Sequence, residues 1–186
     1  MIAAGADFAF VRNSSAWAIG HDDGEKIVVT HLTERRPGQV ALRPSVTFRE
    51  CAHDLVTAGA RIVMADIHYR ESAREAFEPF GITLRGTPAT HEPHVEFRRQ
   101  LLEDVIDLRA VASERLAKQL AAVRGTDGSG DKIKITLETA ADGSHGDLVA
   151  ALVLVAWQLR HVRQRARASG GRRERGRALT PREDAR

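Results

Sequence analysis

The most apolar segment of the chain lies near its C-terminal end, at residues 148–159. Its apolar side chains fall on nearly every face of a helix, and a helix of this kind must be buried on all sides. The longest apolar run within it, residues 148–157, is far shorter than the roughly 20 residues that a membrane span needs. We therefore expect a folded core around this helix, with its N-terminus against a sheet and no association with a membrane.

The composition is that of a globular protein. A chain of 186 residues predicts one domain of ordinary size, or one domain plus a tail. Hydrophobic residues make up 42% and charged residues 28%, which is enough to bury a sizeable core. The single cysteine excludes a disulfide framework and any multi-cysteine metal site. No basic and then apolar leader opens the chain, so we expect a cytoplasmic protein.

Charge divides the chain into two parts. Residues 160–186 hold ten arginines against three acidic residues, a net charge of +7, which leaves −4 for residues 1–159. From residue 162 onward Arg, Gly and Ser dominate, a composition typical of disorder. We predict a globular domain at 1–160 and a basic, arginine-rich, disordered tail at 161–186. The tail either adds salt-dependent affinity for DNA phosphates or is a solvated extension, and the sequence favours neither.

Hydrophobic periodicity predicts three short strands followed by alternating helices and strands. The expected strands are 3–11, 15–20, 26–32, 61–66, 81–84 and 132–137, and the expected helices are 47–59, 72–80, 93–105, 113–123 and 144–159. Residues 125–131 are expected to form a glycine-rich turn. This order indicates an α/β fold with a mixed sheet covered by helices, in which the first strand can pair with the fourth.

Three aspartates do not fit their apolar surroundings. Asp7 lies inside the apolar first strand, Asp66 ends the buried fourth strand, and Asp147 begins the last helix. Each has a purely structural alternative, because Asp7 could be a strand-end residue bonded to backbone and Asp66 a cap or turn residue. Asp147 with Ser144 forms a capping-box pattern. An unpaired carboxylate is costly to bury, which is why these positions are candidates for function.

The expected topology brings the three aspartates to one edge of the sheet. Pairing of the first and fourth strands places Asp7 beside Asp66, and the buried last helix carries Asp147 toward the same edge. Convergent carboxylates repel one another unless cations hold them, and hard oxygen ligands select Mg²⁺ or Mn²⁺. Two such ions about 4 Å apart can activate water and stabilise the leaving oxygen of a phosphodiester.

Several stretches in this order resemble the C-terminal nuclease domain of the large terminase subunit of tailed bacteriophages. They are Gly-Ala-Asp-Phe-Ala-Phe-Val-Arg-Asn-Ser-Ser-Ala at 5–16, the strand that ends in Asp66, Leu-Ala-Lys-Gln-Leu at 116–120, and Gly-Ser-His-Gly-Asp-Leu-Val-Ala-Ala-Leu at 143–152. The likeness covers residues from about 3 to 160. It implies an RNase H-like fold, with a mixed sheet of five or slightly more strands and helices on both faces.

The resemblance implies a divalent-metal endonuclease that cuts concatemeric phage DNA during packaging. Asp7, Asp66 and Asp147 would be its catalytic and metal-binding acids, with two Mg²⁺ or Mn²⁺ ions. His145 stands where some relatives use histidine as an auxiliary metal or water partner. Asn13 stands where many relatives carry a second aspartate, and its carbonyl can bind without bringing a charge.

The implied partners are double-stranded DNA, the terminase ATPase domain, the small terminase and the portal, in the cytoplasm of a bacterial host. Arg12, Arg35, Arg36 or the tail would contact DNA. The chain lacks the ATPase of large terminases, because the glycines at 125–130 are not followed by the Lys-Ser/Thr of a phosphate loop. It is expected to be an excised domain, a split gene product or a prophage remnant.

Two other functions stay open on the sequence. An isolated domain could be a non-catalytic module that docks on DNA or on the packaging motor. It could also be another RNase H-like nuclease, such as a junction resolvase.

Overall fold

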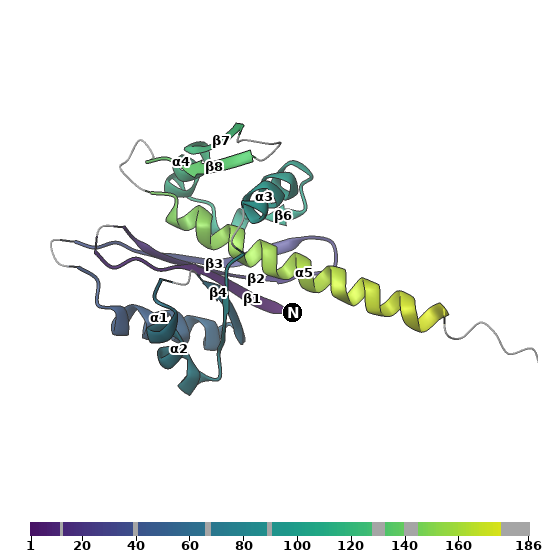
Figure 1. The fold of residues 1–186 in the computed structure, drawn as a ribbon, viewed down its shortest axis with the longest axis horizontal. Helices are drawn as coiled ribbons and strands as arrows, with labels where there is room; N and C mark the ends of the chain where they lie inside the picture. Colours follow the sequence, from purple (N-terminus) through teal and green to yellow (C-terminus); the bar gives the residue numbers. More distant parts are fainter. Residues whose placement is uncertain are drawn as a thin grey trace, which may run out of the picture.

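The computed structural model describes residues 1–11, 13–38, 41–65, 68–88, 91–127, 133–139 and 145–175, with side chains for all of these except 126–127, 133–134 and 165–175. A mixed sheet lies between two layers of helices (Figure 1). The strands are β1 (Ile2–Asp7), β2 (Ser15–Asp22), β3 (Ile27–Arg35), β4 (Ile62–Ala65), β5 (Thr83–Gly86), β6 (Ile106–Asp107), β7 (Val123–Asp127) and β8 (Ile133–Leu137). The α-helices are α1 (Pro44–Thr57), α2 (Arg70–Phe77), α3 (Glu92–Leu102), α4 (Glu114–Ala121) and α5 (Asp147–Arg175).

The main sheet has six strands in the order β5-β4-β1-β2-β3-β6, and β7 and β8 form a separate hairpin. β1 runs antiparallel to β2 and parallel to β4, so the predicted pairing of the first and fourth strands is confirmed. α1 and α2 lie on one face of the sheet, and α5 lies on the other with α3, α4 and the hairpin beyond it (Figure 1). The RNase H-like fold class, a slightly larger sheet with helices on both faces, is confirmed.

The structure differs from the predicted elements at three places. α1 begins at Pro44, whose ring fixes φ for a first helical residue, and Thr47 is buried inside the helix instead of capping it. β6 was not predicted, since a two-residue strand leaves no periodic pattern. β7 takes up residues expected to end a helix and begin a turn, because β8 supplies its hydrogen-bonding partner.

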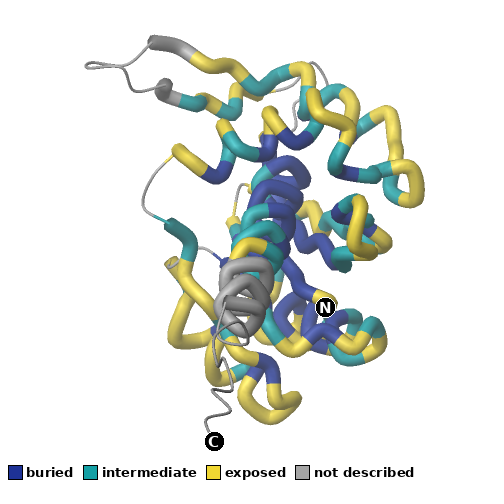
Figure 2. Tube along the Cα trace, turned by 90° about the vertical axis from the view of Figure 1, so that its right-hand side faces the viewer, coloured by how far each residue is buried: buried dark blue, intermediate teal, exposed yellow. Residues whose placement is uncertain are grey.

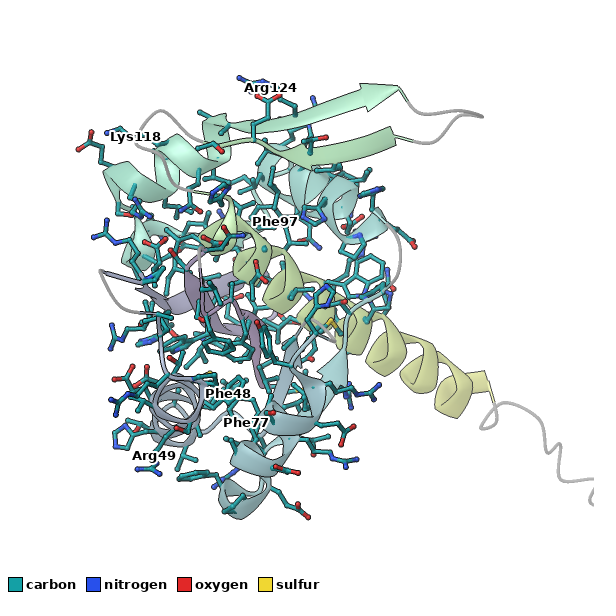
Figure 3. All side chains as sticks on the ribbon, turned by 60° about the vertical axis from the view of Figure 1, so that its left-hand side comes forward. Phe48, Arg49, Phe77, Phe97, Lys118 and Arg124 are labelled. Carbon is teal, nitrogen blue, oxygen red and sulfur yellow. The ribbon has the colours of Figure 1, made fainter. Side chains whose placement is uncertain are left out.

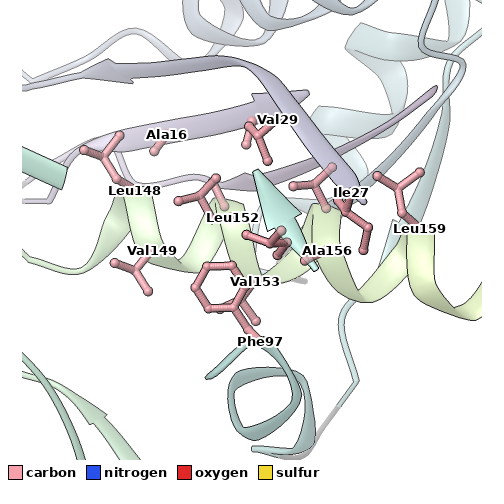
Figure 4. Close-up of a cluster of buried hydrophobic side chains, with 14 of the residues drawn as sticks. Ala16, Ile27, Val29, Phe97, Leu148, Val149, Leu152, Val153, Ala156 and Leu159 are labelled. Atoms are coloured by element: carbon pink, nitrogen blue, oxygen red, sulfur yellow. The ribbon is translucent and has the colours of Figure 1, made fainter. Parts of the chain in front are cut away.

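A hydrophobic core lies on each face of the sheet. Phe48 and Phe77 lie on the α1 and α2 side, and Phe97 lies on the α5 side (Figure 3). The predicted buried helix is confirmed, because the first half of α5 runs through the middle of the molecule (Figure 2). Its Leu152 and Ala156 pack against the sheet (Figure 4).

α5 crosses β1 at very short range. A Cβ built on Gly5 would lie 2.3 Å from the Ala151 carbonyl oxygen and 2.5 Å from the Val155 nitrogen. Further along the helix, Arg163 forms an ion pair with Asp22 at the other end of the strands, where β2 meets the start of β1. The helix and β1 therefore run in opposite directions, so the N-terminus of α5 lies near the carboxyl end of β1.

α5 continues to Arg175, beyond the predicted domain boundary at residue 160. The ion pair of Arg163 with Asp22 ties the beginning of the predicted tail to the sheet. Residues 176–186 lie outside the described residues, and the division of the chain into a domain and a tail stays a prediction. Among the described helices, none is long and apolar enough to cross a membrane.

Candidate functional site

Asp7 is the last residue of β1 and is half-buried. Side chains of a strand alternate between the two faces of the sheet, and Ala3 belongs to the core on the α5 face. Gly5 contacts the α5 backbone on that same face. By this alternation the Asp7 side chain also points to the α5 face, at the end of β1 that the helix N-terminus approaches.

Asp147 is the first residue of α5 and is only 4% exposed. Burial raises the pKa of its carboxyl group, and the nearby Glu34 carboxylate raises the pKa further. Hydrogen bonding by the backbone and side chain of Ser14 and the charge of His145 act in the opposite direction. Among the described residues, nothing hydrogen-bonds to its buried Oδ2 atom. A buried carboxylate oxygen without a donor is costly, and a bound cation would remove that cost.

Glu34 is an acidic residue of this site that the sequence analysis missed. It pairs with Ala16 on β2, and Ala16 pairs with Asp7 on β1, so the two carboxylates lie in one row on one face of the sheet. The small Ala16 side chain lies between them. The Glu34 side chain is 9% exposed and accepts two hydrogen bonds from Arg115 of α4, from Nε to Oε2 and from Nη2 to Oε1 at 2.8 Å.

Asp66 lies outside the described residues. The strand before it is described to Ala65, which pairs in parallel with Ala6. Ala6 precedes Asp7 in the sequence, and its partner Ala65 precedes Asp66.

The remaining candidates lie around this edge of the sheet. His145 is exposed, with its Nδ1 atom 3.5 Å from the Thr139 hydroxyl, and Asn13 is exposed. Arg36 is exposed with its Nε atom 3.9 Å from Glu34 Oε2. Arg35 pairs with Glu50 at 2.8 Å.

Arg35 is a DNA-contact candidate whose side chain the structure places on the other face of the sheet. Arg35 lies over the ring of Trp17, 5.7 Å from its centre. Trp17 belongs to the core on the α1 face, so Arg35 faces away from the acidic residues. Arg12 lies outside the described residues.

Within the described ranges, which omit Asp66, no group of three His, Cys, Asp or Glu side chains lies close enough to hold a metal ion. The described residues therefore bring Asp147 close to Glu34 and place Asp7 in the same row of the sheet. The third predicted acid, Asp66, directly follows β4 in the sequence and lies outside the described ranges.

No family model and no curated protein sequence matches this chain. Solved structures do match it. The large terminase nuclease from thermophilic phage G20c is 16% identical, with 85% of this chain and 82% of that chain covered and a TM-score of 0.66. The nuclease domain of the large terminase subunit gp2 of bacterial virus Sf6 is 14% identical, with 83% and 87% covered and a TM-score of 0.59.

A third neighbour is the g2p (large terminase) nuclease domain from bacteriophage SPP1 with bound Mn. It is 16% identical, with 83% of this chain and 84% of that chain covered and a TM-score of 0.53. These neighbours agree with the resemblance carried by the sequence motifs. The chain therefore has the fold of the nuclease domain of phage large terminase subunits.

Proposed function

We propose that this chain is a divalent-metal-dependent DNA endonuclease of the terminase type, with Asp7, Asp66 and Asp147 as its catalytic acids. The observation that carries the proposal is the Asp147 carboxylate, which is buried at the helix N-terminus with one oxygen left without a described hydrogen-bond donor. The crossing of α5 over β1 at Gly5 sets this carboxylate toward the end of β1 that bears Asp7.

The register of β1 and β4 supports Asp66 as the third acid. Ala4 pairs with Val63 and Ala6 pairs with Ala65 in the parallel register of the two strands. If this register continued by one residue, Asp7 would lie opposite Asp66. Parallel strands end at the same edge of a sheet, where α/β folds commonly place their ligands.

The donor set fits Mg²⁺ or Mn²⁺, because carboxylate oxygens are the hard ligands that these ions prefer. When bound, two such ions would stabilise charge on the phosphodiester and lower the pKa of water. Asp7 and Asp66 would hold one ion between them, and Asp147 would complete the second position. His145, two residues before Asp147, and Asn13 would orient water at the rim. Solved relatives of this fold contain manganese or calcium.

Double-stranded DNA is the proposed substrate. The body of the protein is acidic, so approach to DNA needs basic groups at the site. Arg36 is suited to this role, because it is exposed beside Glu34 at the acidic edge. Arg12 and the arginine-rich segment after residue 160 would add contacts that do not depend on base sequence. A terminase ATPase, a small terminase and a portal would be its partners in a phage-infected or prophage-carrying cell.

Supercoiled plasmid incubated with the full chain tests the proposal. We expect Mn²⁺ or Mg²⁺ to produce nicked and then linear DNA, and EDTA to stop the reaction completely. A linear duplex should be cut at least as fast as a four-way junction of the same sequence, whereas a junction resolvase would prefer the branched substrate. Calorimetry that shows no carboxylate-dependent Mn²⁺ binding, together with no cleavage of any DNA, would instead indicate a docking module.

A further inference from the structure

We infer that Glu34 is a positioning residue of the proposed metal site, a fixed carboxylate that adds negative charge to the cation pocket without ligating the cation. This inference rests on the proposed function, since it concerns the same pocket. Glu34 would be a fourth acidic group beside the three aspartates, and Arg115 would hold its carboxylate in place.

The first argument is the row of residues across the sheet. Asp7, Ala16 and Glu34 are successive partners on β1, β2 and β3, and directly paired residues of antiparallel strands point to the same face. Ala16 belongs to the core on the α5 face. Both carboxylates therefore point to the face that carries the N-terminus of α5, where Asp147 is the first residue.

The second argument is that Arg115 fixes Glu34. Both oxygens of the Glu34 carboxylate accept a hydrogen bond from the guanidinium group, which leaves the carboxylate in one orientation. Arg115 lies in the first turn of α4, where the Ser113 hydroxyl accepts a hydrogen bond from the Leu116 nitrogen and fixes the start of the helix. Each oxygen thus already accepts a charge-assisted hydrogen bond, and we assign Glu34 a role through its charge and not as a ligand.

The third argument is that α4 is hydrogen-bonded to the beginning of α5 at this site. Gln119 lies one turn after Arg115 on α4, and its Oε1 atom accepts a hydrogen bond from the Leu148 nitrogen at 2.9 Å. Leu148 follows Asp147 directly. The residue that holds Glu34 and the residue that holds the beginning of α5 thus belong to the same helix.

The fourth argument is charge balance. Two divalent cations bring four positive charges, whereas Asp7, Asp66 and Asp147 bring three negative charges. Glu34 supplies the fourth. Arg115 offsets part of the Glu34 charge through its direct hydrogen bonds, so it limits the repulsion among the acids while the pocket holds no cation.

The test compares Mn²⁺ affinity, measured by titration calorimetry at pH 8 on the full chain, in two variants with opposite expected effects. Glu34→Gln should weaken Mn²⁺ binding by about fivefold to tenfold, because the pocket loses one negative charge in a partly buried setting. Arg115→Gln should strengthen binding by about twofold or more, because the exposed Arg36, 3.9 Å from Glu34 Oε2, then offsets less of the Glu34 charge than the two arginines do together. Glu34→Asp keeps the charge and should bind Mn²⁺ within about twofold of the original chain.

Glu50→Gln is the matched control. Glu50 also pairs with an arginine, Arg35 of β3, but its side chain is 42% exposed on the α1 side of the sheet. It should leave Mn²⁺ affinity unchanged. Equal weakening by Glu34→Gln and Arg115→Gln would overturn the inference, because it would show a purely structural ion pair, and so would an unchanged affinity in Glu34→Gln. Mn²⁺ binding that Asp7→Asn and Asp147→Asn leave intact would instead overturn the proposed function itself.

Discussion

Replacing Asp147 with asparagine should reduce Mn²⁺-dependent plasmid nicking by about 100-fold or more and also raise the melting temperature of the metal-free protein. Activity falls because the amide cannot supply the negative oxygen that a divalent ion needs. Stability rises because the substitution removes a charge that is buried with one oxygen unpartnered by any described residue. Removing such a charge typically gains about 1 kcal/mol, or about 2–4 °C for a chain of this size.

The gain in stability should depend on pH. The folded-state pKa of Asp147 is raised by burial and by Glu34, so the folded protein binds this proton more tightly than the unfolded chain does. Deprotonation therefore destabilises the fold as pH rises above about 4, the ordinary pKa of an aspartate. Differential scanning calorimetry in EDTA should show the full difference between Asp147→Asn and the original chain at pH 8. The difference should disappear as pH falls below about 4.

Asp104→Asn is the control for this substitution. Asp104 is exposed, pairs with Lys26 and has a φ of 53°, a conformation that asparagine also tolerates. It should change neither nicking nor melting temperature by a measurable amount. Asp7→Asn and Asp66→Asn should lose activity to the same extent as Asp147→Asn. Nicking that persists in all three variants would contradict the assignment of the acids.

The placement of Asp7 and Asp147 near one edge of the sheet could be predicted from the sequence, because each interrupts or begins an unusually apolar segment, and their role as acids stays a prediction. The small residues of β1 and the apolar residues of α5 dictate that the two elements pack closely, and this packing carries the two aspartates toward one edge. The pairing of β1 with β4 also follows from the order of the elements. The hydrophobic pattern of the sequence indicates the apolar helix and the order of the elements directly.

Glu34 could not be predicted in this way because β3 contains a bulge. Gly20 pairs with Val29 but Ile19 pairs with His31, so Thr30 is an extra residue in the strand. Before the bulge, odd-numbered residues of β3 such as Val29 face α5. After the bulge, even-numbered residues such as Glu34 face α5. A strict alternation read from the sequence would place Glu34 on the opposite face, and only the strand register shows otherwise.

A substitution at Gly5 should have a second large effect, on the stability of the protein. Alanine at this position should lower the stability of the protein by about 3 kcal/mol or more, a fall in melting temperature of roughly 6–12 °C. The added Cβ would overlap backbone atoms of Ala151 and Val155, and backbone atoms cannot move aside by changing rotamer. α5 would have to shift away from β1 over its whole buried length, which disturbs the core on that face of the sheet.

The same shift would reach the proposed metal site, because Asp147 lies one helical turn before Ala151 and Asp7 lies two residues after Gly5. Mn²⁺ should therefore stabilise Gly5→Ala less than it stabilises the original chain in a thermal melt. Gly38→Ala is the control, since a Cβ there meets nothing within 4 Å and its effect should stay within about 0.5 kcal/mol. If Gly5→Ala melts within about 1 °C of Gly38→Ala, the close crossing of α5 over β1 is wrong, and with it the reason for placing Asp147 beside Asp7.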